Sequence, residues 1–148
     1  MPATSRIEDD VRAALLRDPH IKRPEMIAVA VDDIGTVVLS GAVGSLPQRL
    51  AATHAARKID GVFEVIADYL KVHPPVGDLR ADDQIRAAAV QRIARDERIR
   101  SNNIHVRVLR GRVTLTGYVR QQSESAAAVE EVTSLPGVLD LTNEIEVR

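Results

Sequence analysis

Histidines are the side chains of this sequence best suited to hold a metal or move a proton. There are four of them, without the paired spacing that places two ligands on one helix face, and there is no cysteine. A zinc site needs several ligands that converge on one point. We therefore expect no metal site and no cofactor. The four histidines are His20, His54, His73 and His105.

Three acidic pairs could in principle supply a general acid and a general base. Asp9-Asp10 and Asp82-Asp83 lie in or near the starts of two predicted helices, where negative charge suits the helix dipole. Asp32-Asp33 has the composition of a turn. Acid–base catalysis also needs a cleft, which nothing in the sequence indicates. Capping and turn formation explain these residues better than catalysis does.

Glycine-rich and nucleophile motifs give no stronger signal. Gly41-Ala42-Val43-Gly44 has the spacing of a GxxG loop that clamps nucleic-acid phosphates, but the second copy of the segment ends in Arg120 instead of glycine. A phosphate loop ending in Gly-Lys-Ser/Thr is absent, as is a serine in a nucleophile elbow. We therefore do not expect an enzyme.

The best functional candidate is a run of arginines in the second half of the chain. On a helical wheel Arg92, Arg95 and Arg98 lie beside the apolar face, a layout that could rest on an anionic surface. Each such charge contributes about 1 kcal/mol near anionic lipid, so three give about 3 kcal/mol. The alternative is a solvated face with local ion pairs, since Asp96 and Glu97 are close by.

Composition restricts the class of protein. The 148 residues are 45% hydrophobic and 28% charged, an ordinary globular balance, with a net charge of -1. Neither this charge nor the 2% of aromatic residues favours nucleic-acid binding. We find no stretch long enough for a transmembrane segment and no apolar leader at the start. As written, the chain is expected to be cytoplasmic, or periplasmic and envelope-associated if the sequence is a processed form.

The chain repeats itself. A stretch beginning at Ile7 matches one beginning at Ile85, and the match continues to the end with one residue lost in each of two loops. Two copies of one folding unit follow from this, with domains at 5–72 and 79–148 and a Pro-rich linker at 73–78. The structural motif includes three pairs of glycines, Gly35 with Gly111, Gly41 with Gly117, and Gly61 with Gly137.

Each copy has the pattern helix, strand, strand, helix, strand. In the first copy, helical spacing covers 7–16 and alternation covers 27–31 and 37–43; a second helix covers 46–59 and a last strand 65–72. Ser5 with Glu8 and Ser45 with Gln48 have the spacing of capping boxes. The last strand of the second copy shows the cleaner alternation, with Leu141, Ile145 and Val147.

This order predicts an α+β fold: two tandem αββαβ units, each with two helices on one face of a three-stranded mixed sheet. A strand–helix–strand connection brings the last strand parallel to the second, so we expect the first strand to lie between them. Gly41 and Gly117 occupy inward positions of a strand, where an absent side chain lets a helix or another backbone approach. We expect a helix to cover each of them.

The pattern resembles the BON domain, named for bacterial osmotic-stress and nodulation proteins. The motif Val-x-Leu-x-Gly-x-Val occurs at 37–43 and at 113–119, and 135–147 is similar to the closing segment of the family. Ala67 stands where the family usually has Asn. The resemblance implies binding and does not imply chemistry. Many members of the family are exported, envelope-associated and linked to osmotic stress. Some are thought to bind anionic phospholipids, and one cytoplasmic relative binds potassium.

We therefore expect a non-enzymatic binding module linked to osmotic or envelope stress. Its ligand would be a small molecule, a monovalent or divalent cation, or a partner surface. One alternative is peripheral association with anionic phospholipid membranes through Arg92, Arg95 and Arg98. Another is a protein–protein interaction module that pairs through an exposed sheet edge.

Overall fold

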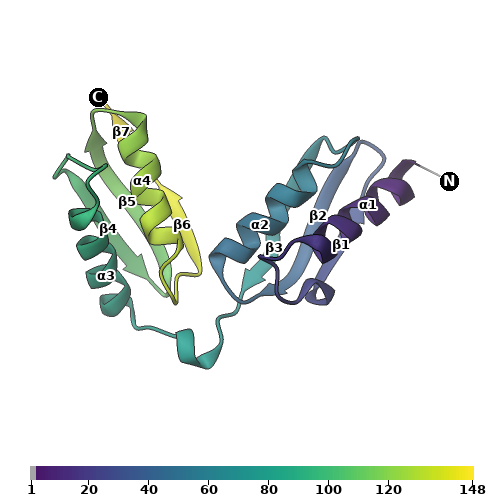
Figure 1. Cartoon of the computed structure of the whole chain (residues 1–148), viewed down its shortest axis with the longest axis horizontal. Helices are drawn as coiled ribbons and strands as arrows, with labels where there is room; N and C mark the ends of the chain where they lie inside the picture. Colours follow the sequence, from purple (N-terminus) through teal and green to yellow (C-terminus); the bar gives the residue numbers. More distant parts are fainter. Residues whose placement is uncertain (1–2) are drawn as a thin grey trace. The chain divides into compact units, whose positions relative to one another are not determined.

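The chain forms two compact units, Met1–His73 and Pro74–Arg148, in a computed structural model that describes residues 3–148 (Figure 1). Each unit has its own helices and its own sheet. Between the units the linker contains a short 3-10 turn, η2 (Val76–Asp78). The duplication of the sequence is thus a duplication of the fold.

Unit 1 follows the expected order of elements. Its helices and strands are α1 (Ala3–Arg17), the 3-10 turn η1 (Pro24–Met26), β1 (Ile27–Val31), β2 (Thr36–Val43), α2 (Leu46–Arg57) and β3 (Glu64–Val72). Ser45 caps α2, because its Oγ accepts a hydrogen bond of 3.4 Å from the Gln48 backbone N–H. Ser5, in contrast, lies inside α1 and does not cap it, and Asp9 and Asp10 lie further along the same helix. The second helix ends at Arg57, two residues earlier than expected.

Unit 2 repeats this order. Its elements are α3 (Asp82–Arg95), β4 (Ile104–Leu109), β5 (Arg112–Val119), α4 (Gln122–Thr133), β6 (Asp140–Asn143) and β7 (Glu146–Val147). The last strand is divided here into β6 and β7, both of which pair with β5 in parallel. The expectation that this copy has the more regular last strand was wrong. The nine-residue β3 of unit 1 is the continuous one, with a register shift against β2.

The central strand of each sheet differs from the one expected. The order is β1-β2-β3, with β2 antiparallel to β1 and parallel to β3. Unit 2 has the same arrangement around β5. The connection rule requires the second and third strands to be parallel, but it does not decide whether they are neighbours. The long β2 and β5 have partners on both edges, so the first strand lies outside.

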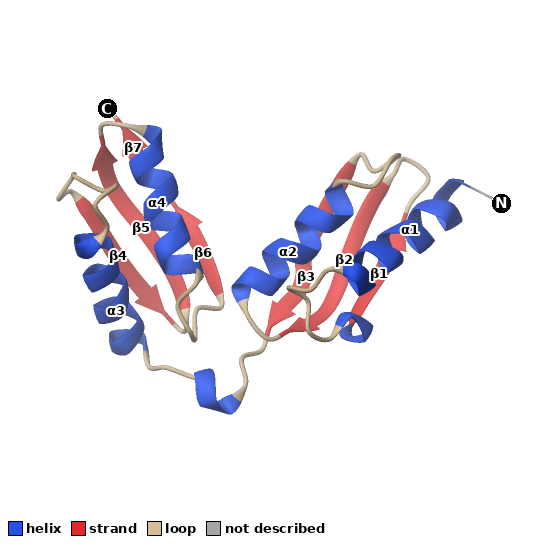
Figure 2. Ribbon diagram, in the orientation of Figure 1, coloured by secondary structure: helices blue, strands red, loops and turns tan. Residues whose placement is uncertain are grey.

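Both helices of each unit cover one face of its sheet, as Figure 2 shows. In unit 1, Ile7, Val11 and Leu15 recur at intervals of four residues along α1 and are buried. Alternate residues of β2, Val37, Leu39 and Val43, are also buried. The equivalent positions of unit 2 are buried too, and include Ile85, Ala89, Ile93, Val113, Leu115 and Val119. Each unit therefore has its own aliphatic core.

Candidate functional site

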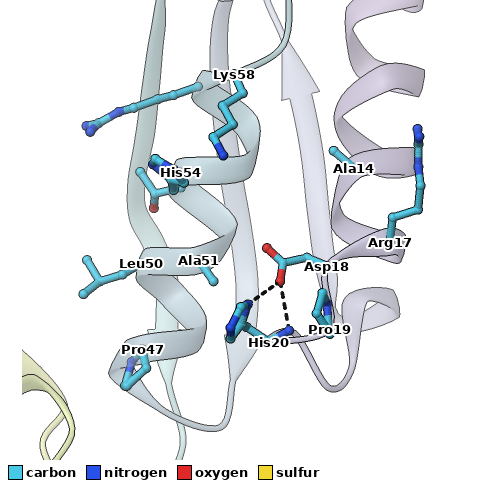
Figure 3. A pocket seen from close by; sticks show the side chains of 12 residues that line it. Ala14, Arg17, Asp18, Pro19, His20, Pro47, Leu50, Ala51, His54 and Lys58 are labelled. Carbon is cyan, nitrogen blue, oxygen red and sulfur yellow. Dashed lines mark hydrogen bonds and ion pairs between the residues drawn. The ribbon is translucent and has the colours of Figure 1, made fainter.

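The helix side of unit 1 contains an open groove of about 870 Å³. The end of α1, the loop that follows it and the exposed side of α2 form its walls (Figure 3). Basic side chains predominate among its ionisable residues, with a single carboxylate, that of Asp18. The ionisable lining residues are Arg17, Asp18, His20, His54, Arg57 and Lys58, and Pro47 and Leu50 are among the others.

The loop after α1 fixes the floor of the groove. The Asp18 carboxylate accepts a hydrogen bond of 2.9 Å from the His20 backbone N–H, and the His20 Nδ1 atom lies 2.9 Å from the same oxygen. The hydrogen bond from the His20 backbone, the His20 ring and the nearby charge of Lys58 hold the pKa of Asp18 below its usual value. Asp18 is therefore ionised and already engaged by His20.

The positive groups of the groove differ in their orientation. The Lys58 side chain reaches back along α2 toward the loop, whereas Arg17 points away from α2 (Figure 3), and its Nε donates a hydrogen bond of 3.3 Å to the Ala13 carbonyl. Thr53 is engaged, since its Oγ1 donates a hydrogen bond of 2.9 Å to the Arg49 carbonyl. Such a groove can attract an anionic group, but it does not place a nucleophile beside a base.

Sequence reasoning missed this groove. His20 and His54 have no paired spacing in the sequence, yet both line the groove, because the fold brings the loop at 18–20 against α2. The available signal was the spacing of His54, Arg57 and Lys58, which places them on one side of a helix. Among residues 3–148, no group of three or more histidine or acidic side chains is arranged to hold a metal ion.

The arginine run of unit 2 is not a free cationic face. Helix α3 ends at Arg95, so Arg98 lies beyond it and not on the helical wheel. Asp96 stops the helix by accepting a hydrogen bond of 2.9 Å from the Arg98 backbone N–H. The Arg98 guanidinium pairs with Asp96 at 2.7 Å and with Glu130 at 2.8 Å. Arg92 donates a hydrogen bond of 3.1 Å to Ser134 Oγ.

These pairings have electrostatic consequences. Hydrogen bonds from the Arg98 side chain and backbone lower the pKa of Asp96 to about 2. Asp96 and Glu130 in turn raise the pKa of Arg98 above its usual value. Of the three predicted lipid contacts, Arg92 and Arg98 therefore form hydrogen bonds or ion pairs within unit 2, while Arg95 is exposed.

The six motif glycines all adopt positive φ, a region that side chains disfavour. Gly41 (φ 109°) and Gly117 (φ 110°) lie in the central strands. A Cβ atom there would collide with the backbone carbonyl of Met26 and of Asn103, respectively. The prediction that a helix covers each of these glycines was therefore wrong. Their close neighbour is the backbone that leads into the adjacent strand. These glycines serve the fold and are not among the residues that line the groove of unit 1.

A buried carboxylate in unit 2 was also missed. Glu124 is only 6% exposed and lies at the start of α4. Its two oxygens accept hydrogen bonds from the backbone of Arg100, Ser101, Arg120 and Gln121, at 2.9 to 3.2 Å, and from Ser101 Oγ at 3.1 Å. These bonds, first that from Arg100, lower its pKa to about 2. It acts as a structural clamp, because every bond goes to its own unit.

Several known proteins are similar to this chain. The chain is 29% identical to osmotically-inducible protein Y of Escherichia coli (strain K12), over 97% of this chain and 72% of that protein. Two solved structures of CdsD, a structural protein of the type III secretion system of Chlamydia trachomatis, are similar at 17% and 16% identity, with TM-scores of 0.40 and 0.41. This chain spans 66% and 63% of their length.

Among residues 3–148, no helix is long and apolar enough to cross a membrane.

The family comparison identifies both units. The BON domain model matches residues 3–74 and 81–148, so that each unit corresponds to one match. The chain therefore belongs to the BON domain family and carries two BON domains in tandem.

Proposed function

We propose that this chain is a non-enzymatic binding module of the osmotic stress response, and that it binds an anionic ligand in the groove of unit 1. The link to osmotic stress rests on the likeness to an osmotically inducible protein. The anionic ligand rests on one observation: Arg17, Arg57 and Lys58 line a groove whose single carboxylate, Asp18, is already bound by His20.

The expected affinity is modest. Three cations near an anionic lipid surface contribute about 3 kcal/mol, and this attraction is weakened by salt. Arg17 and Arg57 also lie in the last turns of their helices, where positive charge stabilises the helix dipole. Part of their role is therefore structural. A ligand with a phosphate group fits the site best, because guanidinium and ammonium groups both bind phosphate oxygens.

Vesicle flotation of the full chain tests this function and separates it from the alternative in unit 2. Vesicles of phosphatidylglycerol with phosphatidylcholine are compared with phosphatidylcholine alone, at low salt and at physiological salt. The double variant Arg57→Gln with Lys58→Gln removes two groove charges. The double variant Arg92→Gln with Arg95→Gln removes two charges of the arginine run.

Binding that is lost only in the groove variant supports the proposal. Loss only in the arginine-run variant overturns it in favour of membrane association through unit 2. Thermal melts with inorganic phosphate distinguish a free anion from a lipid headgroup, because a specific ligand raises Tm as its concentration passes the Kd. Absence of both vesicle binding and a phosphate-dependent rise in Tm would reject the anionic site.

Thermal melts in potassium, sodium and calcium chloride test whether the module binds a cation and not an anion. A site made of backbone carbonyls would leave no cluster of acidic side chains. A rise in Tm specific to one cation, at constant ionic strength, would replace the anionic ligand with a cation. Equal melts in the three salts would reject a cation sensor.

A further inference from the structure

The sheet of unit 1 has a second face, opposite its helices, that is largely apolar. Paired residues on neighbouring strands point to the same face, so Ala28 with Ser40, Ala30 with Val38, and Val38 with Ile66 all lie on the side away from the core. We call this the open face of unit 1. It comprises Ala28, Ala30, Thr36, Val38, Ser40, Ala42, Glu64, Ile66, Tyr69 and Lys71.

The corresponding face of unit 2 is polar over its centre, with the apolar side chains of Leu109 and Tyr118 toward its ends. There the register places His105 beside Thr116, Arg107 beside Thr114, and Thr114 beside Thr142. Such residues are usual for a sheet face in contact with water. The two BON domains have the same fold and similar aliphatic cores. The fold itself therefore does not require apolar residues on the open face. Contiguous apolar surface on a soluble domain commonly marks an interaction site.

Two charges at the ends of one edge strand restrict the partner. Glu64 is at the start of β3 and Lys71 near its end, and both point to the open face, in register with Thr36 and Ala42 respectively. Both side chains are exposed, and neither forms a hydrogen bond or ion pair within residues 3–148. A partner that fits this face presents small apolar side chains between one positive and one negative group.

A second copy of the same face meets that description. Two sheets stacked about a two-fold axis perpendicular to their strands place β3 antiparallel over β3 of the other copy. Glu64 of each copy then opposes Lys71 of the other. Along β2 the same axis places Thr36 opposite Ala42 and Val38 opposite Ser40, with Val38 near the centre. We propose that unit 1 associates with a second copy of this chain through its open face and forms a two-sheet sandwich.

The size of the face sets the strength of this association. With about 3.3 Å per residue and about 4.8 Å between strands, a sheet of this size covers roughly 370 Å². Stable complexes bury about 800 Å² per partner, so an association through this smaller face is weak and is populated only at high chain concentration. The groove of unit 1 is formed by the helix side and stays open in the dimer.

Sedimentation equilibrium of the full chain, from about 10 to about 1,000 µM, covers the concentrations at which a weak association is populated. Val38→Lys places a charge at the centre of the face and weakens the dimer by at least about tenfold. Thr114→Lys makes the same change at the equivalent position of unit 2 and leaves the dimer unchanged. Circular dichroism melts show whether each variant is folded as the unaltered chain is.

Charge reversal tests the arrangement independently of packing. Glu64→Lys alone and Lys71→Glu alone each oppose like charges and weaken the dimer, whereas the double variant restores it. Both positions are exposed, so folding is kept. A chain that is monomeric throughout the concentration range overturns the proposal. So does a dimer weakened by Thr114→Lys and not by Val38→Lys, or one that the double variant fails to restore.

Discussion

Glu124 and Gln48 occupy equivalent positions in the two BON domains and perform the same task with different strength. Gln48 Oε1 accepts one hydrogen bond, of 3.2 Å, from the Lys22 backbone N–H. Glu124 accepts hydrogen bonds from Arg100, the equivalent of Lys22, and also from Ser101, Arg120 and Gln121. In each unit the side chain fastens the loop before the first strand to the start of the second helix. The carboxylate of unit 2 makes the stronger fastening.

Substitution of this clamp should affect the two units unequally. Glu124→Ala leaves five partly buried donors of unit 2 without their acceptor, and loss of a charged acceptor from such donors is costly. We expect Tm to fall by roughly 5 °C or more. Gln48→Ala, the matched change in unit 1, should have a smaller effect. Calorimetry of the full chain measures both, and an equal fall in the two variants would argue against a special role for the carboxylate.

The acid stability of the chain should depend on the same residue. The pKa of Glu124 is about 2 in the folded chain, below its usual value of 4.5. A lowered folded pKa stabilises the fold above the unfolded pKa, and this contribution is lost as the pH falls from about 4.5 toward 2. Glu124→Gln should therefore flatten the decline of stability between about pH 5 and 3.

Urea unfolding at several pH values provides the measurement. The exposed Glu97 supplies the control, because Glu97→Gln also removes one carboxylate but leaves the hydrogen bonds of Glu124 in place. Asp96, whose pKa is also about 2 because of Arg98, and Asp18, whose pKa is lowered by His20, remain in both variants and contribute to the residual slope. A Glu124→Gln profile parallel to that of the unaltered chain would contradict the assignment.

The fold was largely predictable from the sequence because its signals are local. Helical spacing at Ile7, Val11 and Leu15 and alternation at Val37, Leu39 and Val43 both identified buried residues. The strand order was not predictable in this way. The pattern of a strand shows which residues face the core, whereas its neighbours depend on pairing between distant segments. The division of the last strand at Glu144 and Ile145 likewise leaves no mark in the alternation.

The candidate site was less predictable, because its parts are distant in sequence. The groove joins His20 to Lys58 through the packing of α1 on α2, and no spacing along the chain records that contact. The arginine run showed the opposite failure. Its helical wheel assumed that the helix continues to Arg98, but the Asp96 side chain ends it, and Glu130 of α4 pairs with the arginine.

The turn between β4 and β5 is hydrogen-bonded to a side chain that is distant in sequence, that of Asp82. The Asp82 carboxylate of α3 accepts hydrogen bonds from the backbone N–H groups of Arg110 and Gly111, at 2.8 and 2.9 Å. In unit 1 the local Asp32 serves the equivalent turn. Asp82→Ala should lower the free energy of unfolding by about 1–2 kcal/mol. Urea unfolding measures it, with Asp10→Ala as an exposed control in α1. Similar losses in both variants would point to a general effect of charge on the helices.

Glycine substitution in the central strands should be among the most damaging single changes in the chain. An alanine at Gly117 must adopt a φ near 110° and bring its Cβ into the Asn103 carbonyl, and Gly41 is constrained in the same way by Met26. Left-handed strain together with displacement of the adjacent backbone costs about 3 kcal/mol. Gly77→Ala is the control, since nothing lies within 4 Å of its Cβ position and its φ is not positive. Denaturant unfolding should therefore separate both strand variants from Gly77→Ala, and a strand variant as stable as this control would show that the backbone at the strand entry can move aside at little cost.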